Sequence, residues 1–386
     1  MGSLQDRASL RRRVDLAIEQ SLAKQRIVGT VVFIASDGDV IHRVAAGSDD
    51  REAGRPMRQD AIFRLASITK SITTAAAMAL IEQGRLSLDD TVTRWIPEFR
   101  PKLPLGGEAV ITVRHLLTHT AGLSYGLFQA ADGPYRRTGV SDGLDQPGLT
   151  MIEELSRLAS VPLFHTPGSA WSYSLAIDVL GEILARIEGR PLPEVVERLV
   201  TGPLGMTDTA FGVRDPGRLA VPYVDGPPPR RMKDPDLVSP IGAGSGIRFA
   251  PSRMFDPLSF PSGGGGMNGT AADILTFLET LRKGGGAILR PETVRAMMTN
   301  QIGALRIDIE PTPAWGFGFG GAVLMDPELA EVPQAKGTWK WGGVYGHHWY
   351  VDPENRLSVV ALTNTALEGM AGGFVTKLMY AVYGAD

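Results

Sequence analysis

The sequence predicts an α+β fold, in which one antiparallel sheet is built from both ends of the chain, is flanked by helices, and carries an inserted, mainly helical domain. Two patterns support this fold class. Strand-like apolar runs occur at residues 31–44 and again within roughly the last eighty residues. Residues 86 to about 260 are instead rich in proline and glycine, with short helical stretches. We therefore expect residues 1–85 and about 260–386 to form an α/β domain and residues 86–259 a mainly helical one, with the functional cleft between them.

The N-terminal part of the chain supplies a helix, a hairpin and a second, buried helix. Residues 5–25 have the apolar and charged periodicity of an amphipathic helix. The two halves of the hairpin at residues 31–44 are joined by Asp37-Gly38, a dipeptide that favours tight turns. The second helix begins at Ser67 and ends at Gly84. It is almost wholly apolar after its first turn, which indicates burial on all sides.

The later elements are expected from the same signals. They are short helices at 151–160 and 174–188, a helix from 271 to 282 that is capped by Thr270, strands at 315–324, 338–341, 347–352 and 357–364, and a closing helix at 369–383. Residues 227–229 and 242–246 are expected as loops. The glycine run at 263–266 lacks the G-K-[ST] of a phosphate loop, so we interpret it as a turn before a helix.

Composition limits the class of protein. The chain has 386 residues, of which 43% are hydrophobic and 21% charged, with a net charge of −3, as in a globular protein large enough for two domains. The absence of a basic run argues against nucleic acid or an anionic membrane as the main partner. The absence of cysteine excludes disulfides, thiolate zinc sites and a cysteine nucleophile. No apolar run approaches the ~20 residues of a membrane span, and the first residues lack the apolar core of a signal peptide, so we expect a cytoplasmic location.

Ser67 and Lys70 stand one helical turn apart where the buried helix begins. The i, i+3 spacing places the amine and the hydroxyl on the same helix face. A lysine in so apolar a segment has a large desolvation cost unless it is neutral or paired. A desolvated amine beside a hydroxyl is one way in which proteins activate a serine nucleophile. This pair therefore predicts a nucleophile at Ser67 with Lys70 as its base. The same spacing recurs at Ser21 and Lys24, but lysine is ordinary near the end of a charged helix, so we interpret that pair as structural.

A serine–lysine pair needs a further proton carrier and an oxyanion site. Tyr173 is the candidate carrier, because it lies at a loop-to-helix junction and a neighbouring ammonium would lower the pKa of its hydroxyl. The segment Trp341-Gly342-Gly343 ends a strand, and paired glycines let a backbone approach a ligand closely. The amide of Val344 would then join the amide of Ser67 as the second donor to a developing oxyanion.

Five segments in consistent order, within residues 28–380, resemble the serine hydrolases with the class C β-lactamase fold. They are residues 63–70, 114–123, 167–174 with the pattern Pro-Gly-x-x-Trp-x-Tyr-Ser, 203–206, and 341–343. Within that group, Tyr-Ser-Leu and Trp-Gly-Gly are most similar to family VIII carboxylesterases of the EstB type. The resemblance implies Ser67 as nucleophile, Lys70 and Tyr173 as the acid–base pair, and the amides of Ser67 and Val344 as the oxyanion hole.

Two departures from the β-lactamase pattern bear on the substrate. The β-lactamases and penicillin-binding peptidases of this fold have Tyr-x-Asn and Lys-Thr-Gly, whereas here Leu175 stands at the asparagine position and Trp341 at the lysine position. An aromatic wall thus replaces the cation that would pair with a β-lactam carboxylate, which favours neutral, apolar acyl groups. The resemblance implies an esterase for short to medium acyl chains. The alternatives are an acyltransferase with the same acyl-enzyme, a weak β-lactamase or peptidase, and a non-catalytic binding module.

The expected reaction involves Ser67, Lys70 and Tyr173 in two successive steps. Neutral Lys70, alone or sharing its proton with Tyr173, takes the proton of Ser67, which attacks the ester carbonyl. Tyr173 protonates the leaving alcohol, and a water activated by the same pair releases the acid. An aromatic pocket for the substrate is expected from Tyr125, Phe128, Trp171 and Trp341. The expected partner is a small-molecule ester, no cofactor is expected, and the oligomeric state stays open.

Competing sites have weaker support in the sequence. Ser141 fits G-x-S-x-G, but that nucleophile elbow needs a buried strand before it and a helix after it, and both flanks are polar and loop-like. His115 and His119 are expected to be structural. His347 and His348 flank the strand of Trp341, where one of them is a candidate to line the cleft. His42 and His165 have no special context, and no histidine has metal-ligand spacing, so no metal is expected.

Overall fold

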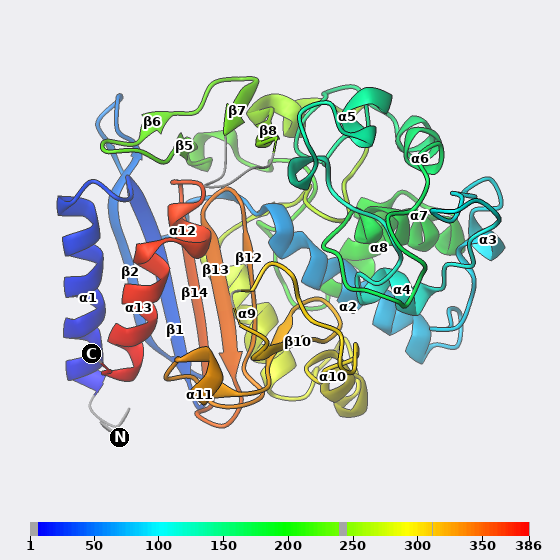
Figure 1. The fold of residues 1–386 in the computed structure, drawn as a ribbon. Helices are drawn as coiled ribbons and strands as arrows, with labels where there is room; N and C mark the ends of the chain where they lie inside the picture. The colour runs from blue at the N-terminus through cyan, green and yellow to red at the C-terminus, as the bar shows by residue number, and fades with distance from the viewer. Residues whose placement is uncertain (1–6, 239–244, 311, 386) are drawn as a thin grey trace.

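A long antiparallel sheet lies at the centre of the molecule, and its strands come from both ends of the chain (Figure 1). The computed structural model describes residues 7–238, 245–310 and 312–385. The strand order is β10-β11-β12-β13-β14-β1-β2-β3. The bounds are β1 Gly29–Ser36, β2 Asp39–Asp50, β3 Arg55–Pro56, β10 Trp315–Phe317, β11 Ala322–Leu324, β12 Trp339–Gly343, β13 His347–Asp352 and β14 Leu357–Thr363. The predicted fold class is confirmed.

The N-terminal hairpin joins β1 to β2 through the predicted turn. Asp37 and Gly38 have φ angles of 53° and 95°, the positive values that a type I′ hairpin turn requires. On its other side β1 pairs with β14, from Thr30 opposite Thr363 to Ser36 opposite Leu357. The first and last strands of the chain are therefore neighbours in the middle of the sheet.

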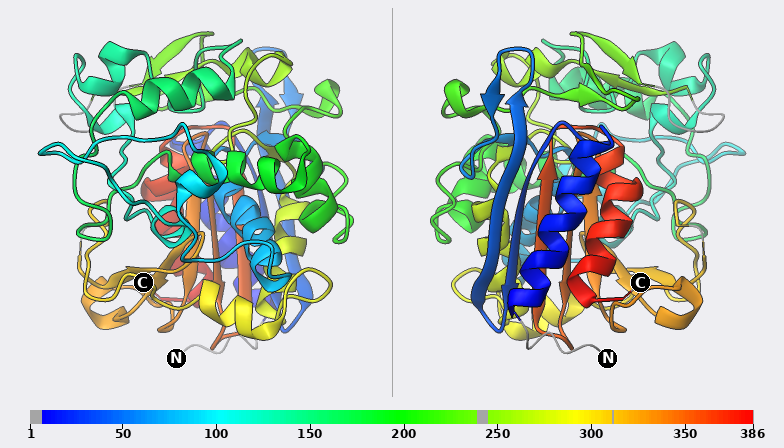
Figure 2. Two further views of the ribbon diagram at one scale, coloured as in Figure 1. Left: turned by 90° about the vertical axis from the view of Figure 1, so that its right-hand side faces the viewer. Right: turned by 90° about the vertical axis from the view of Figure 1, so that its left-hand side faces the viewer.

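Helices cover both faces of the sheet. On one face α1 (Arg7–Ala23) and α13 (Gly373–Tyr383) run side by side (Figure 2). On the other face lie α9 (Ala271–Arg282), which packs on β1 and β14, and α2 (Thr69–Glu82). Successive side chains of β1 alternate between the two faces, so Val32 joins the core under α1 while Val31 joins the core around α2.

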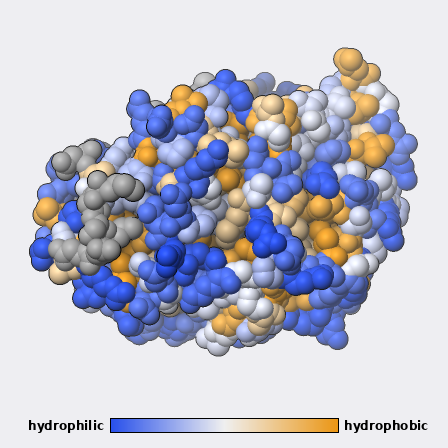
Figure 3. All heavy atoms as spheres, turned by 90° about the horizontal axis from the view of Figure 1, so that it is seen from below, coloured by the Kyte–Doolittle hydropathy of each residue, from blue (hydrophilic) through white to orange (hydrophobic). Residues whose placement is uncertain are grey.

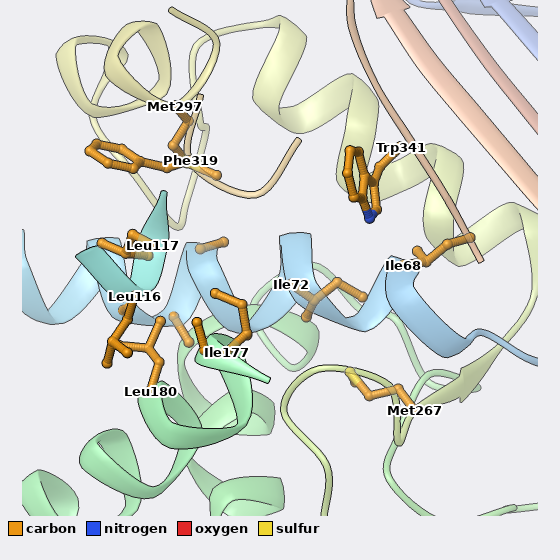
Figure 4. Packing of buried hydrophobic residues seen from close by; sticks show 14 of the residues in the cluster. Ile68, Ile72, Leu116, Leu117, Ile177, Leu180, Met267, Met297, Phe319 and Trp341 are labelled. Atoms are coloured by element: carbon orange, nitrogen blue, oxygen red, sulfur yellow. The ribbon is translucent and has the colours of Figure 1, made fainter. Parts of the chain in front are cut away.

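The predicted buried helix is α2, and side chains from many elements surround it (Figure 4). Every residue from Thr69 to Leu80 is buried, including Lys70. The indole of Trp341 points from β12 toward this helix, near Ile68 and Ile72 (Figure 4). The apolar character of the segment is thus explained by contact on all sides, as the sequence predicts.

The middle of the chain forms short helices, irregular loops and small two-stranded ladders. Its elements are α3 Val92–Trp95, α4 Val113–Leu117, α5 Pro134–Thr138, α6 Met151–Ala159, α7 Ala176–Glu188, α8 Leu192–Val196, β5 Tyr223–Val224, β6 Arg230–Arg231, β7 Asp236–Val238 and β8 Ile247–Phe249. The predicted loop at 227–229 is confirmed between β5 and β6. The predicted loop at 242–246 lies mostly outside the described residues. The division into two domains stays a prediction.

Two predicted elements are each divided in the structure. The strand expected at 315–324 is two short strands, β10 and β11, because glycines at 318, 320 and 321 make the turn between them and Gly320 has a φ of 84°. The closing helix is divided into α12 (Glu368–Ala371) and α13, with extended backbone at Gly372. The glycine run at 263–266 is a turn as predicted, but the two-residue strand β9 (Asn268–Gly269) precedes α9.

The surface seen from below is mostly hydrophilic, with apolar side chains in scattered groups (Figure 3). Among the residues that the structure describes, none of the helices combines the length and the hydropathy needed to cross a bilayer.

Candidate active site

Ser67 lies in a tight turn that leads directly into α2. The chain passes through β4 (Phe63–Arg64) and then a single 3₁₀ turn, η1 (Ala66–Ile68), before α2 begins at Thr69. The predicted helix start at Ser67 is thus a 3₁₀ turn that continues into the α-helix. Ala66 has a φ of 45°, a left-handed conformation that an alanine adopts only at a cost in free energy. This turn leaves Ser67 half-buried while both of its neighbours are buried.

Lys70 lies beside Ser67 in a position that water barely reaches. Its side chain is 2% exposed, and Nζ donates to Ser67 Oγ at 3.2 Å and to the carbonyl of Gly264 at 2.6 Å. The same nitrogen is 4.7 Å from the ring centroid of Tyr173 and 5.2 Å from that of Tyr125, within cation–π range. The structure therefore brings the predicted amine and hydroxyl together.

Tyr173, the third predicted catalytic residue, lies near Lys70 at the end of the loop that leads into α7. Its ring stacks on Trp171, with centroids 6.3 Å apart and an interplanar angle of 13°. Its hydroxyl accepts a hydrogen bond from Trp341 Nε1 at 3.3 Å. Lys70 contacts the face of this ring, and the described hydrogen bonds include none between Lys70 and the Tyr173 hydroxyl. The prediction from the sequence was that Tyr173 lies next to Lys70. In the structure the ring of Tyr173 contacts Lys70, and its hydroxyl is also hydrogen-bonded to the indole of Trp341.

The end of β12 lies against the segment that carries the nucleophile. A Cβ on Gly343 would meet the carbonyl oxygen of Leu65 at 2.4 Å, so only glycine allows the strand to approach so closely. A Cβ on Gly342 would meet the carbonyl of His347 at 2.7 Å. The paired glycines thus accommodate protein backbone, which differs from the predicted approach to a ligand. Val344 follows them, and its amide is the donor in none of the hydrogen bonds found among the described residues.

The four predicted pocket aromatics gather around Tyr173. Tyr125, Phe128 and Trp341 have ring centroids 5.1, 6.4 and 5.2 Å from that of Tyr173. Phe128 is half exposed, whereas Trp171 is buried and supports Tyr173 from one side. The sequence missed two further members, Phe317 and His119, which also pack against this cluster. Neither has a local signal, since their elements meet only in three dimensions.

The histidines near the site are structural, as predicted for His115 and His119. His115 accepts from the amide of Thr112 and completes the cap of α4. Burial, with the nearby charge of Lys70, holds the pKa of His119 well below its usual value, so this ring is neutral. Burial also lowers the pKa of His347 to about 4, and its Nε2 donates to the carbonyl of Arg64 at 2.7 Å. In the described part of the chain no three His, Asp or Glu side chains converge as metal ligands.

The two competing serines are held in structural contacts. Ser141 is fully buried, and its Oγ donates to Asp145 Oδ1 at 2.5 Å. The short helix α5 precedes it where a nucleophile elbow needs a strand. Ser21 donates to the carbonyl of Ala17 within α1, and Lys24 stands just beyond the end of that helix.

A buried carboxylate, Asp178, lies close to Lys70 and was missed from the sequence. It is in the first turn of α7, and its Oδ1 accepts from Ser262 Oγ at 2.5 Å and from the amide of Gly264 at 3.2 Å. The signal that located Lys70 was available here too, because Asp178 is the one charge in the apolar run 174–181. Burial raises the pKa of Asp178, and the charge of Lys70 opposes that effect.

The glycine turn is tied to α2 by side chains from one helix face. Thr69 Oγ1 accepts from the amide of Met267 at 3.1 Å, and Thr73 Oγ1 donates to the carbonyl of Gly263 at 2.9 Å. Lys70 binds the carbonyl of Gly264 between these two contacts. The arrangement offers a half-buried hydroxyl, a buried amine, a phenol and a backbone amide that has no acceptor among the described residues. Acyl transfer through serine requires this set of groups.

A cavity of about 580 Å³ lies next to this turn but does not include Ser67, Lys70 or Tyr173. Its lining includes Gly265, Gly266, Leu144, Phe211 and Arg253.

Comparison with known proteins places the chain in a family. Residues 14–378 match the β-lactamase family, so the chain belongs to it. It is 50% identical to Esterase EstB of Burkholderia gladioli, over 98% of this chain and 96% of that protein. It is 30% identical to Acyltransferase calJ of Penicillium decumbens, over 89% and 85% of the two chains.

A solved structure agrees with these matches. EstCE1, described as a hydrolase with promiscuous acyltransferase activity, superposes with a TM-score of 0.94 at 48% identity, over 98% of this chain and 99% of that one. The resemblance inferred from the motifs is thus confirmed, both for the fold and for the EstB-type group.

Proposed function

We propose that this chain hydrolyses carboxylic esters through a covalent acyl-enzyme on Ser67. The chain is a carboxylesterase of the β-lactamase family. The assignment of Ser67 as nucleophile and Lys70 as its base rests on one observation. The amine of Lys70, which is almost fully buried, lies 3.2 Å from the half-buried hydroxyl of Ser67. Burying an amine that has no direct ion pair with any of the described residues costs free energy, so its place beside a hydroxyl points to a functional role.

The first half of the reaction acylates Ser67. The Lys70–Tyr173 pair takes the hydroxyl proton as Ser67 Oγ forms a bond to the ester carbonyl carbon. The carbonyl oxygen becomes an oxyanion, which the amides of Ser67 and Val344 stabilise. The bond to the alcohol oxygen then breaks, and the pair returns its proton to the departing alcohol. The amide of Val344, which donates to no acceptor among the described residues, and the close approach of Gly343 to Leu65 support this oxyanion assignment.

The second half releases the acid. A water molecule gives one proton to the Lys70–Tyr173 pair and attacks the acyl carbon, and the bond to Ser67 Oγ breaks as the serine regains a proton. The carboxylic acid leaves, and the site returns to its starting protonation state.

The surroundings of the site favour neutral substrates with short to medium acyl groups. Trp341 occupies the position at which the anion-binding lysine of β-lactamases is expected, and its indole is directed at Tyr173. Tyr125 and Phe128 extend the aromatic surface on the side of Tyr173. Burial raises the pKa of Tyr125, so this phenol stays neutral. We expect nitrocefin, which carries a carboxylate, to be a far poorer substrate than a p-nitrophenyl ester.

Acyl transfer is a second activity that the same site supports. The aromatic cluster shields the acyl-enzyme, and two of the similar proteins are described as an acyltransferase and as a hydrolase with acyltransferase activity. If an alcohol takes the place of water in the second half, the product is a new ester. The ratio of acid to ester formed from one acyl donor with a competing alcohol measures the balance.

Replacing each candidate serine tests the proposal. We expect Ser67→Ala to abolish turnover of p-nitrophenyl butyrate and labelling by a fluorophosphonate probe. Ser141→Ala should retain most of both, because Ser141 is buried in a contact with Asp145. Retained activity in Ser67→Ala together with loss in Ser141→Ala would reverse the assignment.

A further inference from the structure

Lys70 and Asp178 flank the same backbone position, Gly264. A Cβ placed on Gly264 would lie 2.5 Å from Asp178 Oδ2 and 3.3 Å from Lys70 Nζ. No direct ion pair between the two side chains occurs among the contacts of the described residues. They are instead connected through the glycine, whose amide donates to Asp178 Oδ1 and whose carbonyl accepts from Lys70 Nζ. A side chain at position 264 would therefore displace the carboxylate, the amine or the turn itself.

The carboxylate of Asp178 is incompletely hydrogen-bonded. The side chain is 2% exposed, and within the described structure Oδ2 has no hydrogen-bond partner. An unpartnered, buried carboxylate oxygen costs free energy that folding alone does not require, since the Ser262 and Gly264 contacts use only Oδ1. The nearby positive charge of Lys70 is the interaction that offsets this cost.

We propose that Asp178 is a positioning residue, the buried counter-charge of the Lys70 amine, which also holds the Gly264 carbonyl against Lys70. This inference rests on the proposed function, because it concerns the acid–base pair of Ser67. Asp178 and Tyr173 stand five residues apart at the start of α7, so one segment supplies both the phenol and the counter-charge.

The direction of the electrostatic effect follows from charge. A carboxylate favours the protonated form of a nearby group, so removing its charge favours the deprotonated form. Other groups also act on Asp178. Lys70 and Arg253 contribute positive charge, and its own charge acts in turn on Tyr125 and Glu154. Of these, only Lys70 shares Gly264 with it.

Asp178→Asn tests the proposal, because asparagine keeps the shape and the acceptor for Ser262 while removing the charge. The readout is the pH dependence of kcat/KM for a p-nitrophenyl ester, measured by chromatography of the product. We expect the low-pH limb to move to lower pH by about one unit, because the pair loses a favourable negative neighbour. We expect kcat on the plateau to fall at least about tenfold, since a weaker base accepts the serine proton less readily, with KM little changed.

Two further variants keep the test decisive. Ser262→Ala removes a donor that stabilises the carboxylate, so it should shift the limb in the same direction by a smaller amount. This variant decides the question if Asp178→Asn does not fold. Glu154→Gln is the matched control, because Glu154 is equally buried but contacts the amide of Ser141, away from Lys70, so its profile should equal that of the wild type.

A purely structural role predicts different data. Folded Asp178→Asn and Ser262→Ala proteins whose low-pH limb coincides with that of the wild type would overturn the inference. Fluorophosphonate labelling of Ser67 in the wild type separates this result from failure of the proposed function. A labelled wild type with unshifted variants rejects only the role of Asp178, and an unlabelled wild type rejects the acyl-enzyme.

Discussion

Lys70 is held by four contacts of two kinds, and each compensates for part of the cost of burying an amine. The hydroxyl of Ser67 and the carbonyl of Gly264 accept hydrogen bonds from its amine. The faces of the Tyr125 and Tyr173 rings make cation–π contacts with it. Hydrogen bonds and cation–π contacts stabilise an ammonium without neutralising it. The amine is therefore fixed in position beside the Ser67 hydroxyl, as a proton carrier must be.

Tyr173→Phe separates the hydroxyl of this residue from its ring. The phenylalanine keeps the stacking on Trp171 and the face presented to Lys70, but it loses the group that accepts from Trp341. We expect kcat for ester hydrolysis to fall by about 10²–10⁴-fold, the usual contribution of a general acid–base. The melting temperature should change by only a few degrees, because the packing is preserved. A variant that keeps more than a third of the wild-type kcat would remove Tyr173 from the proton path.

At the scale of elements, the site depends on the turn at residues 263–267 as much as on α2. Hydrogen bonds from the side chains of Thr69, Lys70 and Thr73 fix this turn to α2. A hydrogen bond to the side chain of Asp178 fixes it to α7. The turn thus connects α2, which carries Lys70, with α7, which directly follows the loop that carries Tyr173. A displacement of its backbone would move the partner of Lys70 without any change in the helices themselves.

Gly264→Ala tests this dependence. The added methyl group would lie 2.5 Å from Asp178 Oδ2 and 3.3 Å from Lys70 Nζ, so the turn must shift. We expect a loss of stability of about 1–3 kcal/mol, as for overpacking in a core, and a fall in kcat of at least about tenfold. Chemical denaturation and ester kinetics measure the two effects.

Gly212→Ala is the matched control for that substitution. A Cβ at Gly212 meets nothing within 4 Å, and its φ is not in the left-handed region. Its stability and kcat should match those of the wild type. Equal behaviour of the two alanine variants would show that the turn tolerates displacement.

The elements that the sequence predicts well are those with a strong local signal. The Asp37-Gly38 turn, the apolar α2 and the strands β12 to β14 depend on residue types within a few positions. The division of β10 from β11 was missed because the apolar pattern continues through the glycines at 318–321. The Ser71 hydroxyl of α2 also donates to the carbonyl of Gly320, a tertiary contact at this turn that the sequence does not report.

Prediction of the candidate site from the sequence is likewise limited to residues that are close together in the chain. Ser67 and Lys70 are close in the sequence, so spacing alone predicts their contact. Asp178 and Gly264 are remote in the chain from Lys70, and single-sequence patterns do not report such proximity. The prediction that Gly342 and Gly343 let the backbone approach a ligand was also wrong. The sequence does not show that the backbone of Leu65 and His347 occupies the space beside these glycines.

For the molecule as a whole, buried carboxyl groups make stability depend on pH. Burial raises the pKa of Glu154 to about 8, against an ordinary value near 4.3 in the unfolded chain. The folded state therefore binds this proton more tightly between those two pH values. Its contribution to stability is complete below about pH 4 and is lost as the pH rises toward 8.

Glu154→Gln should remove this part of the pH dependence. Between pH 5 and 7 we expect the free energy of unfolding of the wild type to fall with pH more steeply than that of the variant, by up to about 1.4 kcal/mol per pH unit. Urea denaturation at several pH values provides the comparison. Parallel curves for the two proteins would mean that Glu154 is already ionised in the folded state.

The pairing of β1 with β14 has a consequence for biosynthesis. A ribosome makes β1 long before β14, because all the other elements of the helical part and most of the sheet lie between them in the sequence. Until then one edge of a strand that is apolar on both faces lacks its neighbour, and such edges recruit other strands. The nascent polypeptide is therefore prone to association until β14 is made. Recombinant yield should accordingly respond to slower translation and to chaperones more than the stability of the finished protein suggests.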